Sequence, residues 1–262
     1  YGNIGKDFSY SINGNLSTIN NEVVKYGDES ISGATIIKEG SPYGAFYVLE
    51  FDRIIQNQTE IDQLLAEGYS FSTDLGGTPK PGDILYKDTN GDKVFDREDR
   101  VIKDYSTLPK MTYGININTA YKGLDFSIVG HGVTGSKGYW GQDGINSFNI
   151  NEGFLLRTNV LDHWTPENRS TKYPRLQIAG TSNTYYSDYW LYDTSYFRIK
   201  SIQLGYSLPK RMISKFQIER LRIYANLENY FTFTSFEGYN PENTSMDYPL
   251  MKQCVIGLNL TF

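Results

Sequence analysis

The chain ends in the stretch that decides its fold, because residues 250–262 read LMKQCVIGLNLTF. In its last part Leu258, Leu260 and Phe262 alternate with Asn259 and Thr261, so apolar and polar side chains lie on opposite faces. A period of two residues indicates an extended strand with two different surfaces. In a soluble β-domain the apolar face packs on a core, whereas in a membrane barrel it faces lipid and the polar face lines the lumen.

Five further segments show the same alternation. The clearest reads MTYGININTAY, in which every second residue from Tyr113 to Ile117 is apolar and the residues between are small or polar. Another segment changes its parity near Ser201, which predicts a β-bulge at that point. The five predicted strands are 8–18, 111–121, 124–133, 196–208 and 220–231.

The connections between the six predicted strands alternate between long and short. Lys122-Gly123 joins two strands as a tight hairpin, and a short helix over 210–216, begun by Pro209, joins two others. The long connections are 19–110, 134–193 and 232–249. Sandwich loops have medians of about 4–6 residues, whereas outer-membrane barrels combine short periplasmic turns with long external loops.

This alternation predicts an all-β fold of about six antiparallel strands in a large transmembrane β-barrel. If Phe262 ends in the periplasm, all three long connections are extracellular loops. Six strands do not close around an aqueous lumen, so the whole chain, 1–262, is predicted to be the C-terminal part of a larger barrel. No plug domain is expected in it.

The first long connection contains two predicted local elements. Residues 45–51 (AFYVLEF) are expected to form a short strand. Residues 59–67 are expected to form a helix that Thr59 caps and Gly68 ends, with an apolar stripe that includes Ile61.

Composition limits the partners. Aromatic residues make up 15% of the chain and there are 25 Gly, a mixture that favours strands and turns. A net charge of −5 and an isoelectric point of about 5.2 argue against nucleic acid, because no basic excess is present to meet phosphates. The single cysteine, Cys254, excludes an internal disulfide framework. No apolar run long enough for a transmembrane helix and no signal peptide are seen, so we expect a fragment or a processed piece.

One stretch has the spacing of a calcium-binding loop. Residues 88–99 read DTNGDKVFDRED, which places oxygen ligands at positions 1, 3, 5, 7 and 12 of the loop. Lys93 stands where the pattern has glycine, and the last ligand is Asp where Glu is usual. The alternative is a turn whose Asp and Asn side chains cap its own backbone. The predicted ligands of a structural Ca²⁺ ion are Asp88, Asn90, Asp92, Val94 and Asp99.

No constellation for catalysis is found in the sequence. His131 and His163 are the only histidines and lie far apart, so neither a zinc site nor a Ser–His–Asp triad is expected. Nothing marks out a carboxylate pair for glycoside hydrolysis. An aromatic run over 185–192 would suit sugar stacking, packing within a loop or an interfacial girdle.

Several stretches together carry a resemblance. PGDILYKDTNGD (81–92), YGININ (113–118) and YKGLDFS (121–127) are followed by HWTPEN (163–168), YFRIKSIQLGYSLP (196–209) and the terminal GLNLTF. In this order they resemble the C-terminal barrel portion of the SusC/RagA family of TonB-linked outer-membrane receptors of Bacteroidetes. Each piece alone is a weak signal, and the ordered set is specific.

The resemblance implies an integral outer-membrane transporter, not an enzyme, with a barrel of about 22 strands around a plug. Its partners would be membrane lipid, the N-terminal barrel and plug portion of the same receptor, TonB acting through that portion, and a SusD-like surface lipoprotein. The ligand would be an oligosaccharide or a peptide. Two other readings stay open: a secreted, calcium-stabilised β-rich carbohydrate-binding module, and a β-rich glycosidase.

Overall fold

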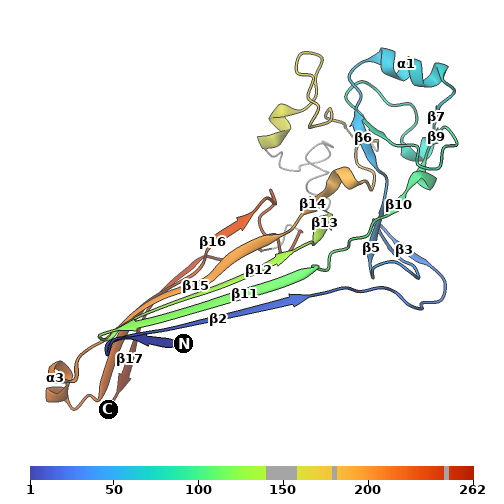
Figure 1. The fold of residues 1–262 in the computed structure, drawn as a ribbon. Coiled ribbons are helices and arrows are strands. Elements are labelled where there is room, and N and C mark those ends of the chain that lie inside the picture. Colours follow the sequence, from blue (N-terminus) through green and yellow to red (C-terminus); the bar gives the residue numbers. More distant parts are fainter. Residues whose placement is uncertain (140–157, 179–181, 245–247) are drawn as a thin grey trace.

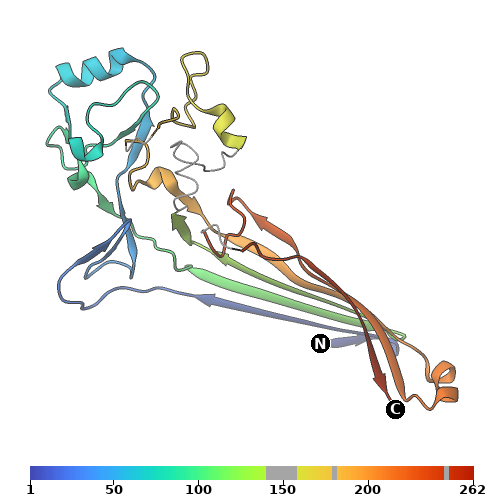
Figure 2. The ribbon, with the colours of Figure 1, turned by 180° about the vertical axis from the view of Figure 1, so that it is seen from behind.

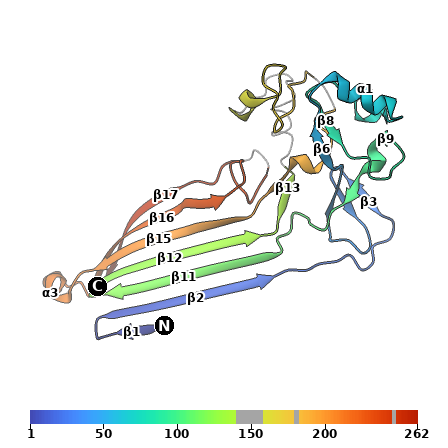
Figure 3. The ribbon, with the colours of Figure 1, turned by 45° about the horizontal axis from the view of Figure 1, so that its top comes forward.

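The computed structural model describes residues 1–139, 158–178, 182–244 and 248–262. Within them, the largest element is a seven-stranded antiparallel sheet, whose strands lie side by side in Figure 3. Its order is β1-β2-β11-β12-β15-β16-β17. The strands are β1 (Gly2–Ile4), β2 (Phe8–Thr18), β11 (Met111–Tyr121), β12 (Leu124–Thr134), β15 (Tyr196–Ser207), β16 (Arg220–Thr234) and β17 (Gln253–Thr261).

All six strands predicted from alternation are present, and the count of six is wrong by one. The additional strand, β1, lies before the first predicted strand and pairs only with β2. A three-residue strand is too short to show a period in sequence, which is why it was missed. The sheet is open, with β1 and β17 at its two edges, so no closed barrel is formed by the described residues.

The strand connections divide between the two ends of the sheet. Figures 1 and 2 show, from opposite sides, that the long connections leave one end, while the hairpin between β11 and β12 and helix α3 lie at the other. At the hairpin both Lys122 and Gly123 have positive φ, 47° and 88°. A side chain at Gly123 would place its Cβ 2.7 Å from the Ser207 carbonyl oxygen, so this position requires glycine.

The parity change in β15 is a β-bulge, as predicted. The registers of β15 with both neighbours skip Lys200, one residue from the predicted position. The extra residue keeps Ile202 and Leu204 on the same face as Phe197 and Ile199. Without it, the second half of the strand would turn its apolar side chains toward the polar face.

Helices and short strands make up much of the rest. The predicted helix after Pro209 is confirmed as α3 (Lys210–Ile213) with a 3-10 turn, η5 (Ser214–Phe216). Among the helices of the described residues, none combines the length and apolar character that crossing a membrane requires. The remaining strands are β3 (Ser30–Ser32), β4 (Thr35–Ile37), β5 (Ala45–Val48), β6 (Phe51–Ile54), β7 (Ser70–Phe71), β8 (Ile84–Tyr86), β9 (Val94–Phe95), β10 (Val101–Ile102), β13 (Lys137–Tyr139) and β14 (Leu191–Asp193).

The long connections are not simple loops. Residues 19–110, 158–178 and 182–193 fold together into one body at the end of the sheet, which we call the cap (Figure 1). Part of the predicted loop 134–193 lies outside the described residues. The strand predicted over 45–51 is two strands, β5 and β6, which turn into different small sheets. The cap also contains the helix α1 (Gln58–Ala66) and the 3-10 turns η1 (Thr73–Leu75), η2 (Arg97–Asp99), η3 (Thr158–Asp162) and η4 (Asp188–Trp190).

Helix α1 begins one residue earlier than predicted, and its cap differs. The Asn57 side chain, not that of Thr59, accepts the backbone N–H of Glu60, at 3.1 Å. Gly68, at φ 89°, follows the end of the helix and donates its N–H to Leu65. Ile61 is fully buried and joins the helix to a cluster with Ile55, Leu85 and Phe95.

Candidate functional site: the two faces of the sheet

The sheet presents one apolar and one polar face, and the apolar face is exposed. Ile12, Leu16, Ile256 and Leu258 have exposed fractions of 58%, 68%, 77% and 67%. A soluble protein rarely leaves so large an apolar surface in water. The alternation of all six long strands places side chains of this kind on the same face.

Aromatic rings gather near both ends of the apolar face. Toward the cap, Tyr113, Phe197 and Phe233 form a ladder, with ring centroids 6.0 and 6.4 Å apart and nearly parallel planes. Toward the other end, Tyr121 and Tyr206 are exposed. Along β11 the span from Tyr113 to Tyr121 is about 27 Å at about 3.4 Å per residue. At a tilt of about 40° it would rise about 21 Å, which is comparable with the aromatic-bounded apolar band of about 25 Å of membrane barrels.

Amides and hydroxyls form hydrogen-bonded rows on the polar face. Asn118 Nδ2 donates to Ser11 Oγ at 3.2 Å and to Asn116 Oδ1 at 3.1 Å. Two strands further along, Ser201 Oγ donates to Asn226 Oδ1 at 2.7 Å. Satisfied polar side chains of this kind form a surface that suits water or a polar ligand.

Near the hairpin end, a charged pair crosses the polar face. Arg222 Nε donates to Asp125 Oδ1 at 2.9 Å, and its Nη2 donates to Gln203 Oε1 at 2.9 Å. The pair spans β15, because Arg222 is on β16 and Asp125 is on β12. Glycine at 205 leaves room for the guanidinium, which would lie 2.4–2.7 Å from a Cβ built there.

Near the cap end, a second charged cluster joins the sheet to the segment before β17. Arg198 is 2% exposed, and its Nη1 donates to Glu242 Oε2 at 2.6 Å. Lys200 Nζ donates to Glu242 Oε1 at 3.1 Å, and the Tyr196 hydroxyl donates to the same carboxylate. Burial by itself raises the pKa of Glu242, but the hydrogen bonds from Tyr196, Arg198 and Lys200 outweigh it and lower the pKa to about 2.

The cap is held together by a buried carboxylate. Asp83 is 1% exposed and accepts hydrogen bonds from Arg175 Nε at 2.7 Å, Gln177 Nε2 at 2.8 Å and Asn183 Nδ2 at 3.1 Å. These partners come from the second long connection, so the contact joins segments almost a hundred residues apart. The Lys103 ammonium makes a similar link between Glu50, at 2.6 Å, and Asp188, at 3.1 Å.

The aromatic run over 185–192 packs within the cap. Trp190 is 1% exposed, donates its Nε1–H to the Asn183 carbonyl at 2.9 Å and meets the Tyr189 ring edge-on. Burial raises the pKa of the Tyr189 hydroxyl well above its ordinary value. The prediction that the run packs within a loop is therefore confirmed for these two residues.

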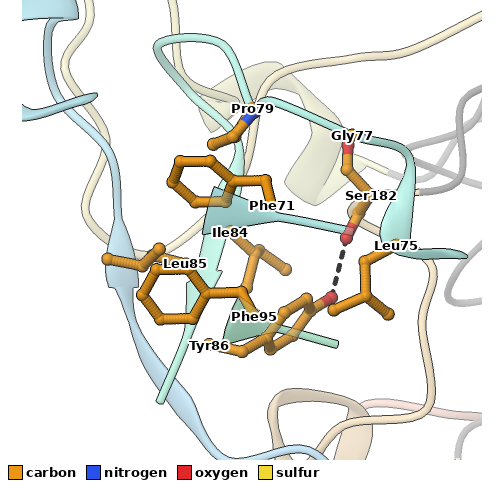
Figure 4. Close-up of a pocket in the computed structure, with 9 residues that line it drawn as sticks. All are labelled: Phe71, Leu75, Gly77, Pro79, Ile84, Leu85, Tyr86, Phe95 and Ser182. Atoms are coloured by element: carbon orange, nitrogen blue, oxygen red, sulfur yellow. Dashed lines mark hydrogen bonds between the residues drawn. The ribbon is translucent and has the colours of Figure 1, made fainter. Parts of the chain in front are cut away.

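A small apolar pocket opens beside this core (Figure 4). It lies between Phe71, Leu75, Ile84 and Phe95, and the Tyr86 hydroxyl at its edge donates to the Ser182 carbonyl at 2.7 Å. The space amounts to about 20 Å³, and one water molecule needs at least about 10–15 Å³ by the same measure. The pocket is therefore too small for a sugar or a peptide.

The predicted calcium ligands cap their own backbone. Asp88 Oδ1 accepts the Gly91 N–H at 2.7 Å, Asn90 Oδ1 accepts the Asp92 N–H at 2.9 Å, and Asp92 Oδ1 accepts the Val94 N–H at 2.7 Å. Asp99 Oδ1 accepts the Thr89 N–H at 2.7 Å and the Asn90 N–H at 3.4 Å. Across the described residues, no three or more His, Cys, Asp or Glu side chains form a group that could hold a metal ion.

The two histidines lie in different parts of the structure. His131 lies on the polar face, with its Nδ1 3.2 Å from the Tyr196 hydroxyl. His163 lies in the cap, with its Nδ1 2.7 Å from the Val160 carbonyl oxygen. Among the described residues, neither belongs to a group of three or more His, Cys, Asp or Glu side chains that could hold a metal ion.

Known receptors match the chain along almost its whole length. It is 27% identical to TonB-dependent receptor P3 of Formosa agariphila over 98% of this chain, and 25% identical to TonB-dependent receptor SusC of Bacteroides thetaiotaomicron over 99% of it. The chain is homologous to TonB-dependent receptors of the SusC/RagA type. No family model matches the sequence.

Solved structures of this type share the fold. The RagAB peptide transporter superposes on the whole chain with a TM-score of 0.74 at 22% identity, and the RagAB peptide importer in the "closed-closed" state does so with a TM-score of 0.72. TonB-dependent receptors are outer-membrane transporters and not enzymes. The chain spans about a quarter of the length of the curated relatives it matches: 27% of the Formosa receptor and 25% of SusC.

The charged pairs of the polar face are the residues that sequence reasoning missed. Arg198 and Arg222 both lie on predicted strands and alternate there with apolar residues. The sequence therefore predicts that both point to the polar face of the sheet. Their partners Asp125 and Glu242 lie on another strand and in a long connection. The distance in sequence between two such residues does not show that they pair.

Proposed function

We propose that this chain forms the C-terminal part of a TonB-dependent outer-membrane transporter that takes up oligosaccharides or peptides together with a SusD-like surface lipoprotein. One observation carries the proposal: the long strands share an exposed apolar face and a hydrogen-bonded polar face. The first suits lipid and the second suits an aqueous lumen.

Each part of the chain then has its own place in the receptor. The polar face lines the lumen, and the cap together with residues 232–249 stands outside the cell. The edge strands β1 and β17 pair with strands from the rest of the receptor, which also supplies the plug and the contact with TonB. This division agrees with the long connections leaving one end of the sheet (Figure 1) and with the chain's share of its relatives' length.

The substrate class rests on the relatives. RagAB is described as a peptide transporter, and SusC is a receptor of the same type. The rows of Asn, Ser and Gln side chains on the polar face are able to bind either sugar hydroxyls or peptide groups, so they support both classes.

We also propose that the loop over 88–99, whose side chains form no metal-holding group as folded here, rearranges to bind a structural Ca²⁺ ion. Each oxygen that accepts a backbone N–H keeps a further lone pair for a cation. Lys93, at φ 64°, adopts the left-handed conformation for which calcium loops use glycine at this position. The ion would brace the cap.

Fractionation of native outer membrane tests the transporter. We expect the full receptor that contains this chain to require detergent and to co-purify, in mild detergent, with a surface lipoprotein identified by mass spectrometry. A water-soluble, monomeric protein in the periplasm or the medium would contradict the proposal. Radiolabelled oligosaccharide and peptide uptake, with and without TonB, then identifies the substrate class.

A further inference from the structure

The cap end of the polar face contains a site that holds a single carboxylate. Three donors from one strand converge on it: the Tyr196 hydroxyl, the Arg198 guanidinium at 2.6 Å and the Lys200 ammonium at 3.1 Å. Arg198 is fixed from behind, because its Nε donates to Thr232 Oγ1 at 2.9 Å on the neighbouring strand. A positioned Arg with a second cation and a hydroxyl is a strong arrangement for binding a carboxylate.

The β-bulge at Lys200 allows the carboxylate site and the apolar face to be formed by the same strand. It allows Arg198 and Lys200 to stay on the polar face while Ile202, Leu204 and Tyr206 stay on the apolar face. Bulges are known to redirect side chains in this manner next to functional sites.

The present occupant of the site belongs to the protein itself. Glu242 comes from the connection between β16 and β17, and its side chain is 32% exposed, so solvent reaches it. The connection is also held by Asn240, whose Oδ1 accepts from Arg198 Nη2 at 2.9 Å and from the Glu242 N–H at 3.2 Å.

Charge limits what is able to replace Glu242. Two cations, Arg198 and Lys200, face one carboxylate, and Arg198 is almost fully buried. Removing Glu242 without a substitute would leave a buried charge without compensation, which is strongly unfavourable. A neutral sugar or a blocked peptide therefore does not fill the site, whereas a second carboxylate does.

We propose that Tyr196, Arg198 and Lys200 form a binding site for a carboxylate of the transported ligand, and that Glu242 occupies this site until the ligand displaces it. The carboxylate would come from a peptide or from a uronic acid of an oligosaccharide. This inference rests on the proposed function, since it narrows the ligand to acidic or free-ended molecules. Displacement also frees residues 240–244 from the sheet, which links ligand entry to the position of this segment.

Hydrogen exchange of the purified full-length receptor tests the site without any transported ligand. We expect acetate, but not acetamide at matched ionic strength, to increase backbone exchange over residues 236–244. Equal exchange in the two solutions would overturn the site, even if the receptor transports.

Binding to variants then tests the ligand class. The probes are a tripeptide and a trigalacturonate, each compared with its C-terminal amide or methyl ester. Glu242→Gln removes the competing carboxylate, so it should tighten binding of the carboxylate forms about tenfold and leave binding of the blocked forms unchanged. Lys200→Gln should weaken binding of the carboxylate forms. The matched control is Glu228→Gln, an acid on the same face that binds Asn226 at 2.8 Å.

The outcomes separate the two proposals. Weaker or equal carboxylate binding by Glu242→Gln would show that Glu242 is only a structural anchor, and the inference would be wrong. A different result would count against the import function. If acetate increases exchange over 236–244, but the receptor binds neither probe and takes up neither oligosaccharides nor peptides, the carboxylate site stands and the proposed import function is wrong.

Discussion

Arg222 reaches across a whole strand to bind Asp125, and it does so above Gly205. The guanidinium lies 2.4–2.7 Å from the position that a Cβ at residue 205 would take. The pair thus joins β12 to β16 without a backbone hydrogen bond between them. It braces the polar face near the end of the sheet that carries the short connections.

Gly205→Ala should break this pair. The new Cβ would lie 2.4–2.7 Å from the guanidinium, so Arg222 must move away from Asp125. We expect a loss of about 1 kcal/mol in the free energy of unfolding, because the pair is partly exposed. Urea unfolding of the full receptor in lipid vesicles measures it, with Gly14→Ala as the control, since the nearest atom to a Cβ there is 3.8 Å away. Additive losses in Gly205→Ala combined with Asp125→Asn would count against the coupling.

The cap should depend on Asp83 more than on any exposed acid. Asp83→Asn removes the partner of Arg175 and a buried acceptor of two amide groups. We expect local opening of the cap to become easier by about 3 kcal/mol, measured by hydrogen exchange of residues 182–190. The control Asp104→Asn changes an acid that is 86% exposed and should cost under about 0.5 kcal/mol. Equal effects of the two variants would show that Asp83 does not hold the cap.

The structure shows which features a sequence is able to predict. A period of two residues is local information, so the long strands, the hairpin at Lys122-Gly123 and the bulge beside Ser201 were all predictable. The loop over 88–99 was predictable as a turn, because Asp and Asn bind backbone two or three residues away.

Contacts between distant segments were not predictable in the same way. The interior of the cap depends on Asp83 meeting Arg175 and Asn183, and the carboxylate site depends on Arg198 meeting Glu242. Neither contact produces a recognisable spacing of residues in the sequence. The helix cap was misassigned for a related reason: Asn57 and Thr59 are both good N-caps, and only the backbone conformation chooses between them.

Calcium should stabilise the cap if the loop over 88–99 binds it. We expect millimolar CaCl₂ to slow hydrogen exchange over 70–99 relative to a chelator, since a ligand that binds only the folded state stabilises it. Asp88→Asn should remove the effect. Asp99→Asn should also raise exchange without calcium, because the buried Asp99 carboxylate accepts the N–H groups of Thr89 and Asp96. Identical exchange in calcium and chelator would exclude the ion.

Acid should release the segment that Glu242 holds, but only well below neutral pH. The folded pKa of Glu242 is about 2, below its ordinary value of 4.5. A lowered pKa means that the contribution to stability is complete above about pH 4.5 and is lost as the pH falls toward 2. Tyr196, Arg198 and Lys200 face this carboxylate, and His131 contacts the Tyr196 hydroxyl. Protection of the amides over 236–244, relative to their intrinsic exchange rates at each pH, should therefore stay constant from pH 7 to about 5. A loss of protection within that range would contradict the lowered pKa of Glu242.

Adjacent residues on one strand give the sharpest test of the two faces. Ile12 is 58% exposed on the apolar face and pairs with Ile117, midway along β11 between Tyr113 and Tyr121. Asn13 follows it on the polar face. Arginine at the lipid-facing middle of a membrane strand costs about 2–4 kcal/mol, whereas a lumen position tolerates it. Ile12→Arg should therefore lower the free energy of folding into lipid vesicles by that amount, and Asn13→Arg should change it little. The reverse order would mean that the lipid and lumen faces are exchanged, and equal losses would mean that neither face meets lipid.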